Sequence, residues 1–338
     1  MHPLKTPILL FSFLCTTLLT AAQTQVPTIS NNIWAIFQDS KGNHWFGSNS
    51  EGLFQFNGEV IYQFTTEDGL IGNQIRGIQE DQEGNILIET SSGVSLYDGQ
   101  SFKSLKAISA GSEKWKLKES DLWFSCNGMA EDVYRYDGER LFQLMLPQFD
   151  IAGKLDVDTS NSFFNAYSPY QIEKDNFGNI WFGTAMAAAI RFDGENFLWI
   201  DSKELTGLGD GRAPGVRSII HDQDGYIWLS NFMYKYEITE TSYSKIENEK
   251  ILSQLPEDIY PYFNSGLIDP EGNLWFATYQ EGVWKFDGEN LHQIPINNKT
   301  GSTRVYTIYL DNDGKIWLGT ESDGAFVFDG ERFDLVLW

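Results

Sequence analysis

The sequence repeats itself, and this repetition limits the possible folds more than any other feature. The first recurring element is an aspartate, a glycine three positions later and a large apolar residue, usually tryptophan, three positions after that. It spans Asp39–Trp45, Asp81–Leu87, Asp175–Trp181, Asp222–Trp228, Asp269–Trp275 and Asp311–Trp317. The second element is an aromatic residue followed by Asp-Gly or Asn-Gly. It begins at Phe56, Tyr97, Tyr136, Phe192, Phe286 and Phe328. A chain built this way is read as a tandem array.

The number of repeats is seven. A further copy of the first element has lost its Asp-x-x-Gly but keeps Trp123, and a degenerate second element lies at Tyr236. The tryptophan-equivalent positions are 45, 87, 123, 181, 228, 275 and 317, which are 36 to 58 residues apart. Seven units of roughly 45 residues therefore fill the chain from residue 23 to its end.

Each unit reads as four short antiparallel strands. In the last unit, Val305–Leu310 and Ile316–Thr320 flank Asp-x-x-Gly, and Gly324–Phe328 leads through Asp-Gly to Phe333–Val336. Both glycine-containing sequences are typical of hairpin turns. Such a sheet cannot bury both faces alone, so it must stack on its neighbours, and seven copies predict a ring. We expect an all-β, seven-bladed β-propeller with four antiparallel strands per blade.

The ring needs a way to close. We expect residues 23–30 to be an extended lead-in, because the repeats start at an inner strand and end at an outer one. Blade seven would then pack against blade one without a shared blade, unless residues 23–30 add a strand.

The repeats resemble the two-component regulator propeller family. Ile308 to Thr320, followed by Gly324 to Gly330, matches its pattern nearly position for position. In that family such propellers form extracytoplasmic sensor regions of membrane histidine kinases, so the resemblance implies ligand sensing. Related propellers also occur in lyases that act on cyclic depsipeptides. This chain shows no transmembrane helix after its repeats and no kinase or response-regulator segment, so we expect no phosphorelay by this polypeptide.

Residues 1–22 read as a secretory signal peptide. Lys5 precedes an apolar run from Ile8 to Leu19, and the small residues of Thr20-Ala21-Ala22 favour cleavage before Gln23. Twelve apolar residues are too few to span a bilayer. The alternative to a signal peptide is a buried strand. The mature chain, 23–338, would be a single exported propeller in the periplasm or outside the cell. It keeps one cysteine, Cys126, which excludes an internal disulfide.

The charge balance excludes two classes of partner. The chain has 47 acidic and 24 basic side chains, for a formal charge of −23. Nucleic acids and anionic membranes both require a basic surface. The high aromatic content, 15%, also argues against a disordered acidic protein. We expect a monomer with no membrane span.

A ligand site is expected where the innermost strands meet one mouth of the central channel. We take the strand before each Asp-x-x-Gly as innermost. The residues five positions before each turn aspartate are Trp34, Arg76, Tyr170, Arg217, Asn264 and Tyr306. Two of the residues seven positions before, Tyr262 and Arg304, extend this candidate site.

The candidate site mixes aromatic, cationic and amide groups, whereas structural columns of a repeat keep one residue type. Arginine forks suit carboxylates or sulfates, and aromatic faces suit sugar rings. We therefore expect Arg76, Arg217 and Arg304 to converge at one mouth. The alternative is that neighbouring acids satisfy these arginines at the rim.

The longest insertion, 147–168, separates the third and fourth units. A long loop of this kind on a propeller face is often functional. Phe163, Phe164 and Tyr167 would cap a site from this loop. Alternatively, the loop packs its own aromatic side chains.

Catalytic, metal and cofactor motifs are not found. His44, His221 and His292 occupy different repeat positions, so a shared metal site is not expected. We expect a ligand-binding or sensing module that takes a small molecule or glycan and works with a protein partner in signalling. Two alternatives stay open: a propeller lyase or hydrolase acting on a polysaccharide or cyclic depsipeptide, and a protein-binding scaffold.

Overall fold

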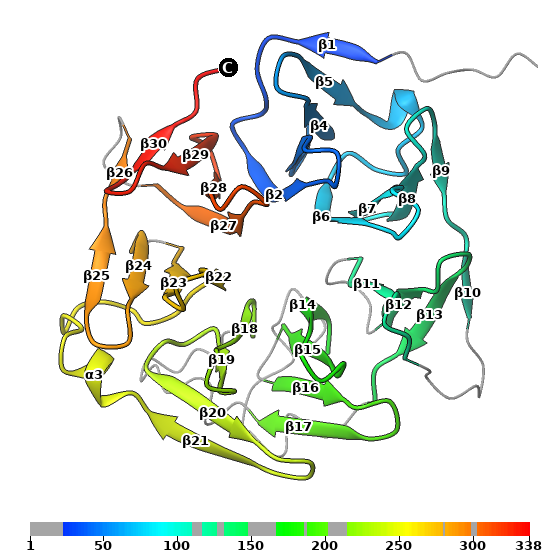
Figure 1. The fold of residues 1–338 in the computed structure, drawn as a ribbon. Helices are drawn as coiled ribbons and strands as arrows, with labels where there is room; N and C mark the ends of the chain where they lie inside the picture. The colour runs from blue at the N-terminus through cyan, green and yellow to red at the C-terminus, as the bar shows by residue number, and fades with distance from the viewer. Residues whose placement is uncertain are drawn as a thin grey trace, which may run out of the picture.

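Seven β-sheets stand side by side around a central axis (Figure 1). The computed structural model describes residues 23–109, 117–126, 132–147, 167–185, 188–201, 215–279, 281–298 and 303–338. The predicted signal peptide lies outside the described residues, as does most of the 147–168 insertion, with Phe163 and Phe164. The predicted seven-bladed, all-β propeller is confirmed.

The strands follow the repeats. Blade one contains β1 (Thr24–Val26), β2 (Ile33–Gln38), β3 (His44–Ser48), β4 (Leu53–Phe56) and β5 (Ile61–Phe64). A short 3-10 helix, η1 (Thr66–Asp68), leads to blade two, which contains β6 (Ile75–Glu80), β7 (Ile86–Thr90), β8 (Gly93–Tyr97) and β9 (Phe102–Ser104). Blade three contains β10 (Ala107–Ser109), β11 (Leu122–Phe124), β12 (Asp132–Tyr136) and β13 (Leu141–Met145).

The remaining blades continue in chain order. Blade four contains β14 (Pro169–Lys174), β15 (Ile180–Thr184), β16 (Ala188–Phe192) and β17 (Phe197–Asp201). Blade five contains β18 (Ile219–His221), β19 (Ile227–Leu229), β20 (Tyr234–Ile238) and β21 (Tyr243–Glu247), followed by helix α3 (Glu249–Leu252). Blade six contains β22 (Ser265–Ile268), β23 (Leu274–Ala277), β24 (Val283–Phe286) and β25 (Leu291–Ile294). Blade seven contains β26 (Ile296–Asn297), β27 (Val305–Leu310), β28 (Ile316–Thr320), β29 (Ala325–Phe328) and β30 (Phe333–Leu335).

Four antiparallel strands are the plan of each blade, with local additions. The strand before each Asp-x-x-Gly, namely β2, β6, β14, β18, β22 or β27, ends its sheet on the side of the axis. Outer strands are added by β1, antiparallel to β5, and by β26, parallel to β30. In blade three, β10 pairs parallel with β13, and β11 is the innermost described strand. This is the unit that lacks Asp-x-x-Gly, the turn that joins the two innermost strands elsewhere.

The turn aspartate also fastens the tryptophan six residues later. Asp39 Oδ1 accepts hydrogen bonds from the amides of Lys41 and Asn43 at 3.0 and 2.8 Å, and its Oδ2 accepts one from the Trp45 indole at 2.9 Å. The same indole-to-carboxylate bond, at 2.8 or 2.9 Å, joins Trp181 to Asp175, Trp228 to Asp222, Trp275 to Asp269 and Trp317 to Asp311. The repeat therefore places each buried indole with its polar N–H already satisfied.

Small residues after the tryptophan let neighbouring blades approach closely. A Cβ added to Gly47 would lie 2.5 Å from Ile75 Cγ2, and one added to Gly183 would lie 2.3 Å from the carbonyl oxygen of Val216. In each case the contact is with the innermost segment of the next blade. Blade stacking thus depends on the small residues two positions after each tryptophan as well as on the tryptophans themselves.

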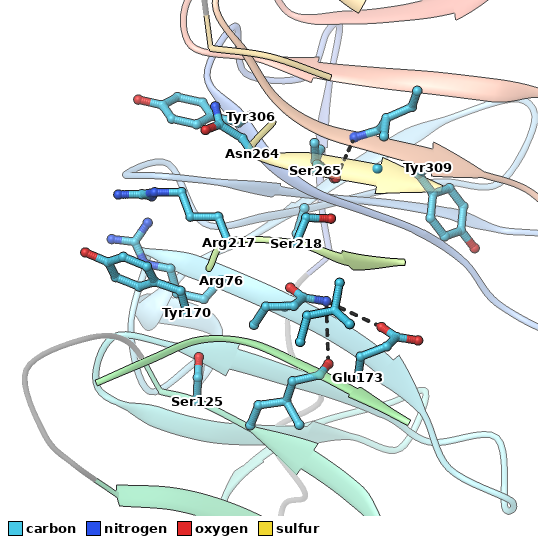
Figure 2. A pocket seen from close by; sticks show the side chains of 18 of the residues that line it. Arg76, Ser125, Tyr170, Glu173, Arg217, Ser218, Asn264, Ser265, Tyr306 and Tyr309 are labelled. Carbon is cyan, nitrogen blue, oxygen red and sulfur yellow. Dashed lines mark hydrogen bonds between the residues drawn. The ribbon is translucent and has the colours of Figure 1, made fainter. Parts of the chain in front are cut away.

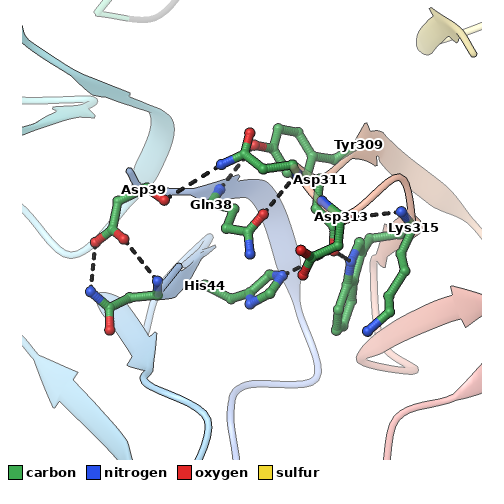
Figure 3. Close-up of polar contacts among 10 residues, drawn as sticks. Gln38, Asp39, His44, Tyr309, Asp311, Asp313 and Lys315 are labelled. Carbon is green, nitrogen blue, oxygen red and sulfur yellow. Dashed lines mark hydrogen bonds and ion pairs between the residues drawn. The ribbon is translucent and has the colours of Figure 1, made fainter. Parts of the chain in front are cut away.

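The ring closes between blades seven and one (Figure 3). His44 Nε2 lies 3.2 Å from Asp311 Oδ2, the Gln38 amide donates to the Tyr309 hydroxyl at 2.9 Å, and the Asn312 amide donates to Gln38 Oε1 at 2.7 Å. β1 extends the outer edge of blade one and does not enter blade seven. The two blades therefore meet face to face, without a shared sheet.

No helix in the described part of the chain has the length and apolar character needed to cross a bilayer.

Candidate functional site

A cavity of about 1690 Å³ follows the axis of the ring. Its walls are the inner strands of six blades and the start of β11 in blade three. Seven residues of the sequence-predicted site line it: Trp34, Arg76, Tyr170, Arg217, Tyr262, Asn264 and Tyr306. The assignment of the innermost strands therefore places these side chains on one cavity.

Arg76 lies on β6 with its guanidinium over an aromatic ring. Its Cζ lies 4.0 Å from the centroid of the Trp34 ring. Burial lowers the pKa of Arg76 to about 10, and the nearby Glu89 carboxylate opposes this shift. Arg76 therefore stays cationic at neutral pH, and its charge is held in a partly desolvated position where electrostatic interactions are stronger.

Arg217 repeats this arrangement in blade five. Its Cζ lies 4.3 Å from the centroid of the Tyr170 ring. The Tyr262 hydroxyl donates to the carbonyl of Gly215 at 2.7 Å. Burial raises the pKa of Tyr262, and the charge and hydrogen bond of Arg217 oppose that rise. Tyr262 therefore lies close to Arg217.

Aromatic rings continue around the same end of the cavity. Tyr306 packs against Trp34 with centroids 4.3 Å apart and ring planes tilted by 37°, and Tyr279 follows at 5.8 Å from Tyr306. Asn264 donates to the carbonyl of Val305 at 3.1 Å. Figure 2 shows Arg76, Tyr170, Arg217, Asn264 and Tyr306 gathered at one end of the cavity, which we call the arginine mouth.

Arg304 does not line the cavity. Its Nη1 pairs with Glu321 Oε2 at 2.8 Å, and its side chain is 46% exposed. Tyr306 donates to the other oxygen of Glu321 at 3.2 Å. The prediction of three converging arginines therefore has to be corrected to two, because Glu321 holds the third at the rim. The alternative given above, satisfaction by a neighbouring acid, describes Arg304.

Sequence reasoning missed Glu89, which occupies the small-residue column on β7. Its carboxylate accepts hydrogen bonds from the amides of Ser125 and Cys126 at 3.0 and 2.7 Å and from the Ser125 hydroxyl at 2.5 Å. Burial nevertheless raises the pKa of Glu89. The detectable signal was a glutamate where the other units have glycine, alanine or serine. The Glu89 carboxylate thus joins blade two to Ser125 and Cys126 of blade three, just after β11, the innermost described strand of that blade.

Glu173 on β14 is the second missed residue. It lies toward the opposite end of the cavity from the arginine mouth, as does Tyr309 (Figure 2). Burial raises the pKa of Glu173 to about 7, and the amide of Gln171, 3.5 Å away, opposes this only weakly. The equivalent positions of the other inner strands carry Phe37, Gln79, Ile220, Leu267 and Tyr309. Glu173 is the acidic residue at this repeat position, and this was the signal in the sequence that could have identified it.

Glu173→Gln should stabilise the protein at pH 8 and leave it nearly unchanged at pH 4.5. The folded-state pKa is raised, so the folded protein binds more protons than the unfolded chain between the two pKa values. Stability then falls as pH rises from about 4.5 to about 7. The expected gain at pH 8 is about 3 kcal/mol. Urea denaturation at both pH values measures it, with the exposed Glu139→Gln as control; an equal gain at both pH values would contradict the assignment.

The histidines are spread over the molecule. His44 lies at the closing junction, His221 is packed against Trp181 with centroids 5.8 Å apart, and His292 is exposed 3.8 Å from Asp287. Burial lowers the pKa of His221. Within the described residues no group of three or more histidine, cysteine or acidic side chains has the geometry to hold a metal ion. Cys126 is a free thiol whose pKa is raised by burial.

Comparison with known proteins agrees with the repeat architecture. The family model described as two component regulator propeller matches residues 28–50 and 301–322. No curated protein sequence matches the chain.

Several solved structures share the fold. The extracellular domain of a hybrid two-component system from B. thetaiotaomicron has a TM-score of 0.59 and 18% identity, over 91% of this chain and 39% of that one. A streptogramin B lyase has a TM-score of 0.61 and 12% identity, over 90% and 96% of the two chains. A catalytically inactive virginiamycin B lyase from Staphylococcus aureus, with quinupristin, has a TM-score of 0.61 and 14% identity, over 89% and 97%.

These likenesses concern the fold, since all three identities are low. The chain spans about two-fifths of the length of the two-component extracellular chain. The family match rests on the repeats themselves, one copy near the start of the ring and one near its end. The chain is thus a seven-bladed propeller that carries two-component regulator propeller repeats.

Proposed function

We propose that this chain is an exported ligand-binding module that holds an anionic or sugar-like ligand at the arginine mouth. The observation that carries the proposal is the pair of guanidiniums, Arg76 and Arg217, each stacked on an aromatic ring and lining one cavity. Guanidinium forks recognise carboxylate and sulfate groups, and exposed ring faces accept sugars or flat ligands.

The negative net charge of the chain strengthens the argument that Arg76 and Arg217 bind an anion. A chain with a formal charge of −23 repels anions at long range. Two cations gathered at one cavity mouth therefore provide local positive charge there, which the Glu89 carboxylate offsets in part at Arg76. Arg304 is not part of this pair because Glu321 neutralises it.

The repeat type supports a sensing role. Repeats of the two-component regulator propeller family match the chain, and extracellular domains of two-component systems share its fold. In this role the bound propeller would act on a protein partner outside the cytoplasm. The predicted signal peptide and the periplasmic or extracellular location belong to the same proposal.

A lyase or hydrolase is the second candidate, and Glu173 favours it. A cavity carboxyl with a pKa near 7 suits general acid or base catalysis, and two lyases share the fold. Turnover of a polysaccharide or cyclic depsipeptide, lost in Glu173→Gln, would support it. For a protein-binding scaffold the support is weaker, since the exposed large apolar residues described are spread over blades three, four and seven.

Arg217→Ala should weaken ligand binding by about 1.5–3 kcal/mol, the usual contribution of a charge-assisted hydrogen bond. The melting temperature should change little. A thermal-shift screen of glycans and uronic acids followed by calorimetry measures both. Arg332→Ala is the matched control, because Arg332 is an exposed arginine in the turn before β30, beside Asp329 and Asp334. A lowered melting temperature with unaltered ligand response would assign Arg217 a structural role instead.

A further inference from the structure

The cavity has a second end, three residues along each inner strand from the arginine mouth. The residues two positions before the turn aspartates line this end: Phe37, Gln79, Glu173, Leu267 and Tyr309. Because a strand rises about 3.3 Å per residue, the two ends are about 10 Å apart. Figure 2 shows Glu173 and Tyr309 here, away from the arginine mouth. We call this the Glu173 end.

Glu173 has no cation partner among the residues that the structure describes. Its carboxylate accepts a single long hydrogen bond, from Gln171 Nε2 at 3.5 Å. The adjacent Lys174 is engaged elsewhere, since its Nζ donates to the carbonyl oxygen of Glu119 at 2.8 Å. Glu173 is therefore a largely buried carboxyl group that lines a cavity and lacks a counter-ion.

The charges along the cavity favour a cation at this end. Six acidic and three basic residues line the cavity: Glu89, Glu119, Asp121, Glu173, Asp258 and Glu281, with Arg76, Lys174 and Arg217. The two arginines belong to the other end, where the Glu89 carboxylate acts on Arg76. The formal charge of −23 on the whole chain adds a long-range attraction for cations.

Two aromatic rings lie on the wall opposite Glu173, at the same register. Glu173 belongs to blade four, and Phe37 and Tyr309 belong to blades one and seven, each three blades away around the ring. The centroids of these two rings are 6.4 Å apart. Aromatic faces attract cations because their π electrons carry partial negative charge. A carboxyl group on one wall and an aromatic pair on the other suit an ammonium group on an apolar body.

The surroundings of Glu173 contain no charge that would offset a bound cation. On the side of blade three, Asp121 is paired, with its Oδ2 3.4 Å from Arg135 Nε. On the side of blade five, burial lowers the pKa of His221, so this ring is neutral near pH 7. The adjoining strand β15 contains no titratable residue. Burial thus raises the pKa of Glu173 to about 7, and a bound cation would favour its ionised form.

We propose that the Glu173 end binds a protonated amine, whose ammonium group pairs with the Glu173 carboxylate while its body lies against Phe37 and Tyr309. The site is separate from the arginine mouth, so this inference does not rest on the proposed function. An uncharged ligand would leave Glu173 without a counter-ion, and an anion would be repelled by it. Arylalkylamines and amino sugars have the required chemistry.

Matched probes test whether the positive charge is recognised. Calorimetry at pH 8 with benzylamine and benzyl alcohol compares a cation with a neutral molecule of nearly the same shape. Benzylamine should bind at least about tenfold tighter. Cyclohexylmethylamine and cyclohexylmethanol repeat the comparison on a saturated ring. Equal binding within each pair would overturn the inference.

The pH dependence tests whether Glu173 is the counter-ion. Benzylamine stays protonated between pH 6 and pH 8, whereas Glu173 has to lose its proton to pair with it. The affinity should therefore fall about tenfold from pH 8 to pH 6, and binding at pH 6.5 should release about 0.8 proton, measured by calorimetry in two buffers. The affinity for benzyl alcohol should not change. An affinity for benzylamine that is equal at both pH values would contradict the assignment.

Variants separate this site from general attraction to an acidic protein. Glu173→Gln should reduce the affinity for benzylamine to that for benzyl alcohol and abolish its pH dependence, whereas the exposed Glu139→Gln, with the same change in net charge, should alter neither. Phe37→Leu should weaken benzylamine binding about threefold. Arg217→Ala, at the other end of the cavity, should change it by no more than about twofold.

The possible failures are distinct. If Glu173→Gln keeps the preference for benzylamine, the amine is held by other acidic residues and the inference is wrong. That result would leave the proposed function intact, because uronic acids and Arg217→Ala test the arginine mouth independently. If uronic acids fail to bind while benzylamine behaves as expected, the proposed function is wrong and the amine site stands. The probe pairs on the unmodified protein decide the question even where a variant fails to fold.

Discussion

Asp39→Ala should lower the free energy of unfolding by about 3–4 kcal/mol. The carboxylate of Asp39 is buried and accepts hydrogen bonds from two turn amides, from the Asn43 side chain and from the Trp45 indole. Alanine removes all four and leaves the fully buried indole N–H without a partner. Urea denaturation followed by fluorescence measures the loss.

Asp81→Ala is the matched control within the same chain. Asp81 accepts the equivalent bonds from the amides of Glu83 and Asn85 and from the Asn85 side chain, at 2.9 Å each. Leu87 stands in place of the tryptophan, so no indole is left unsatisfied. The expected cost is only about 1–2 kcal/mol. Equal costs at the two sites would show that the turn alone matters and that the aspartate-to-tryptophan bond adds no stability.

Gly319→Val should have the other large effect, because it lies where the ring closes. A Cβ at Gly319 would sit 2.7 Å from the carbonyl oxygen of Ile33 and 2.9 Å from its Cγ2, so blade one would have to move away. Overpacking of this kind costs about 3 kcal/mol, and more when backbone is displaced. We expect a strongly destabilised protein with the seam between blades seven and one opened. Urea denaturation and size-exclusion chromatography measure stability and compactness.

Ala277→Gly tests the same column where a side chain is already accommodated. Ala277 occupies the equivalent position in blade six and is fully buried. The change should cost about 1 kcal/mol, mainly through backbone entropy. If Gly319→Val costs no more than this, close approach at the seam is not what closes the ring.

The fold was predictable because the same local interactions recur in each repeat. Asp-x-x-Gly and Asp-Gly each define a turn by local chemistry, and seven copies leave a ring as the way to bury every sheet. The contact between Asp39 and Trp45 was present in the spacing but could not be recognised, since it requires the hairpin to bring positions six apart together. Blade three shows the limit: without Asp-x-x-Gly, the sequence kept only Trp123 as a marker.

The candidate site was predictable only in part. Register alone placed Arg76 and Arg217 on the cavity, because equivalent positions of equivalent strands face the same way. Arg304 was misplaced because its partner, Glu321, faces it across the hairpin of β27 and β28, where the Glu321 amide donates to the Arg304 carbonyl at 3.0 Å. Glu89 and Glu173 were overlooked among 47 acidic residues, since their distinguishing property is burial.

The seam between blades seven and one uses the same type of contact as the other junctions. Gly319 receives the inner strand of blade one as Gly183 receives that of blade five, and the Asn31 carbonyl accepts a hydrogen bond from the Gly324 amide at 2.8 Å. Because the closing junction is of the same type as the others, the ring does not require any particular blade to come first in the chain. Circular permutation, with the chain opened at another hairpin and its present ends linked, would keep the same neighbours in a different order along the chain.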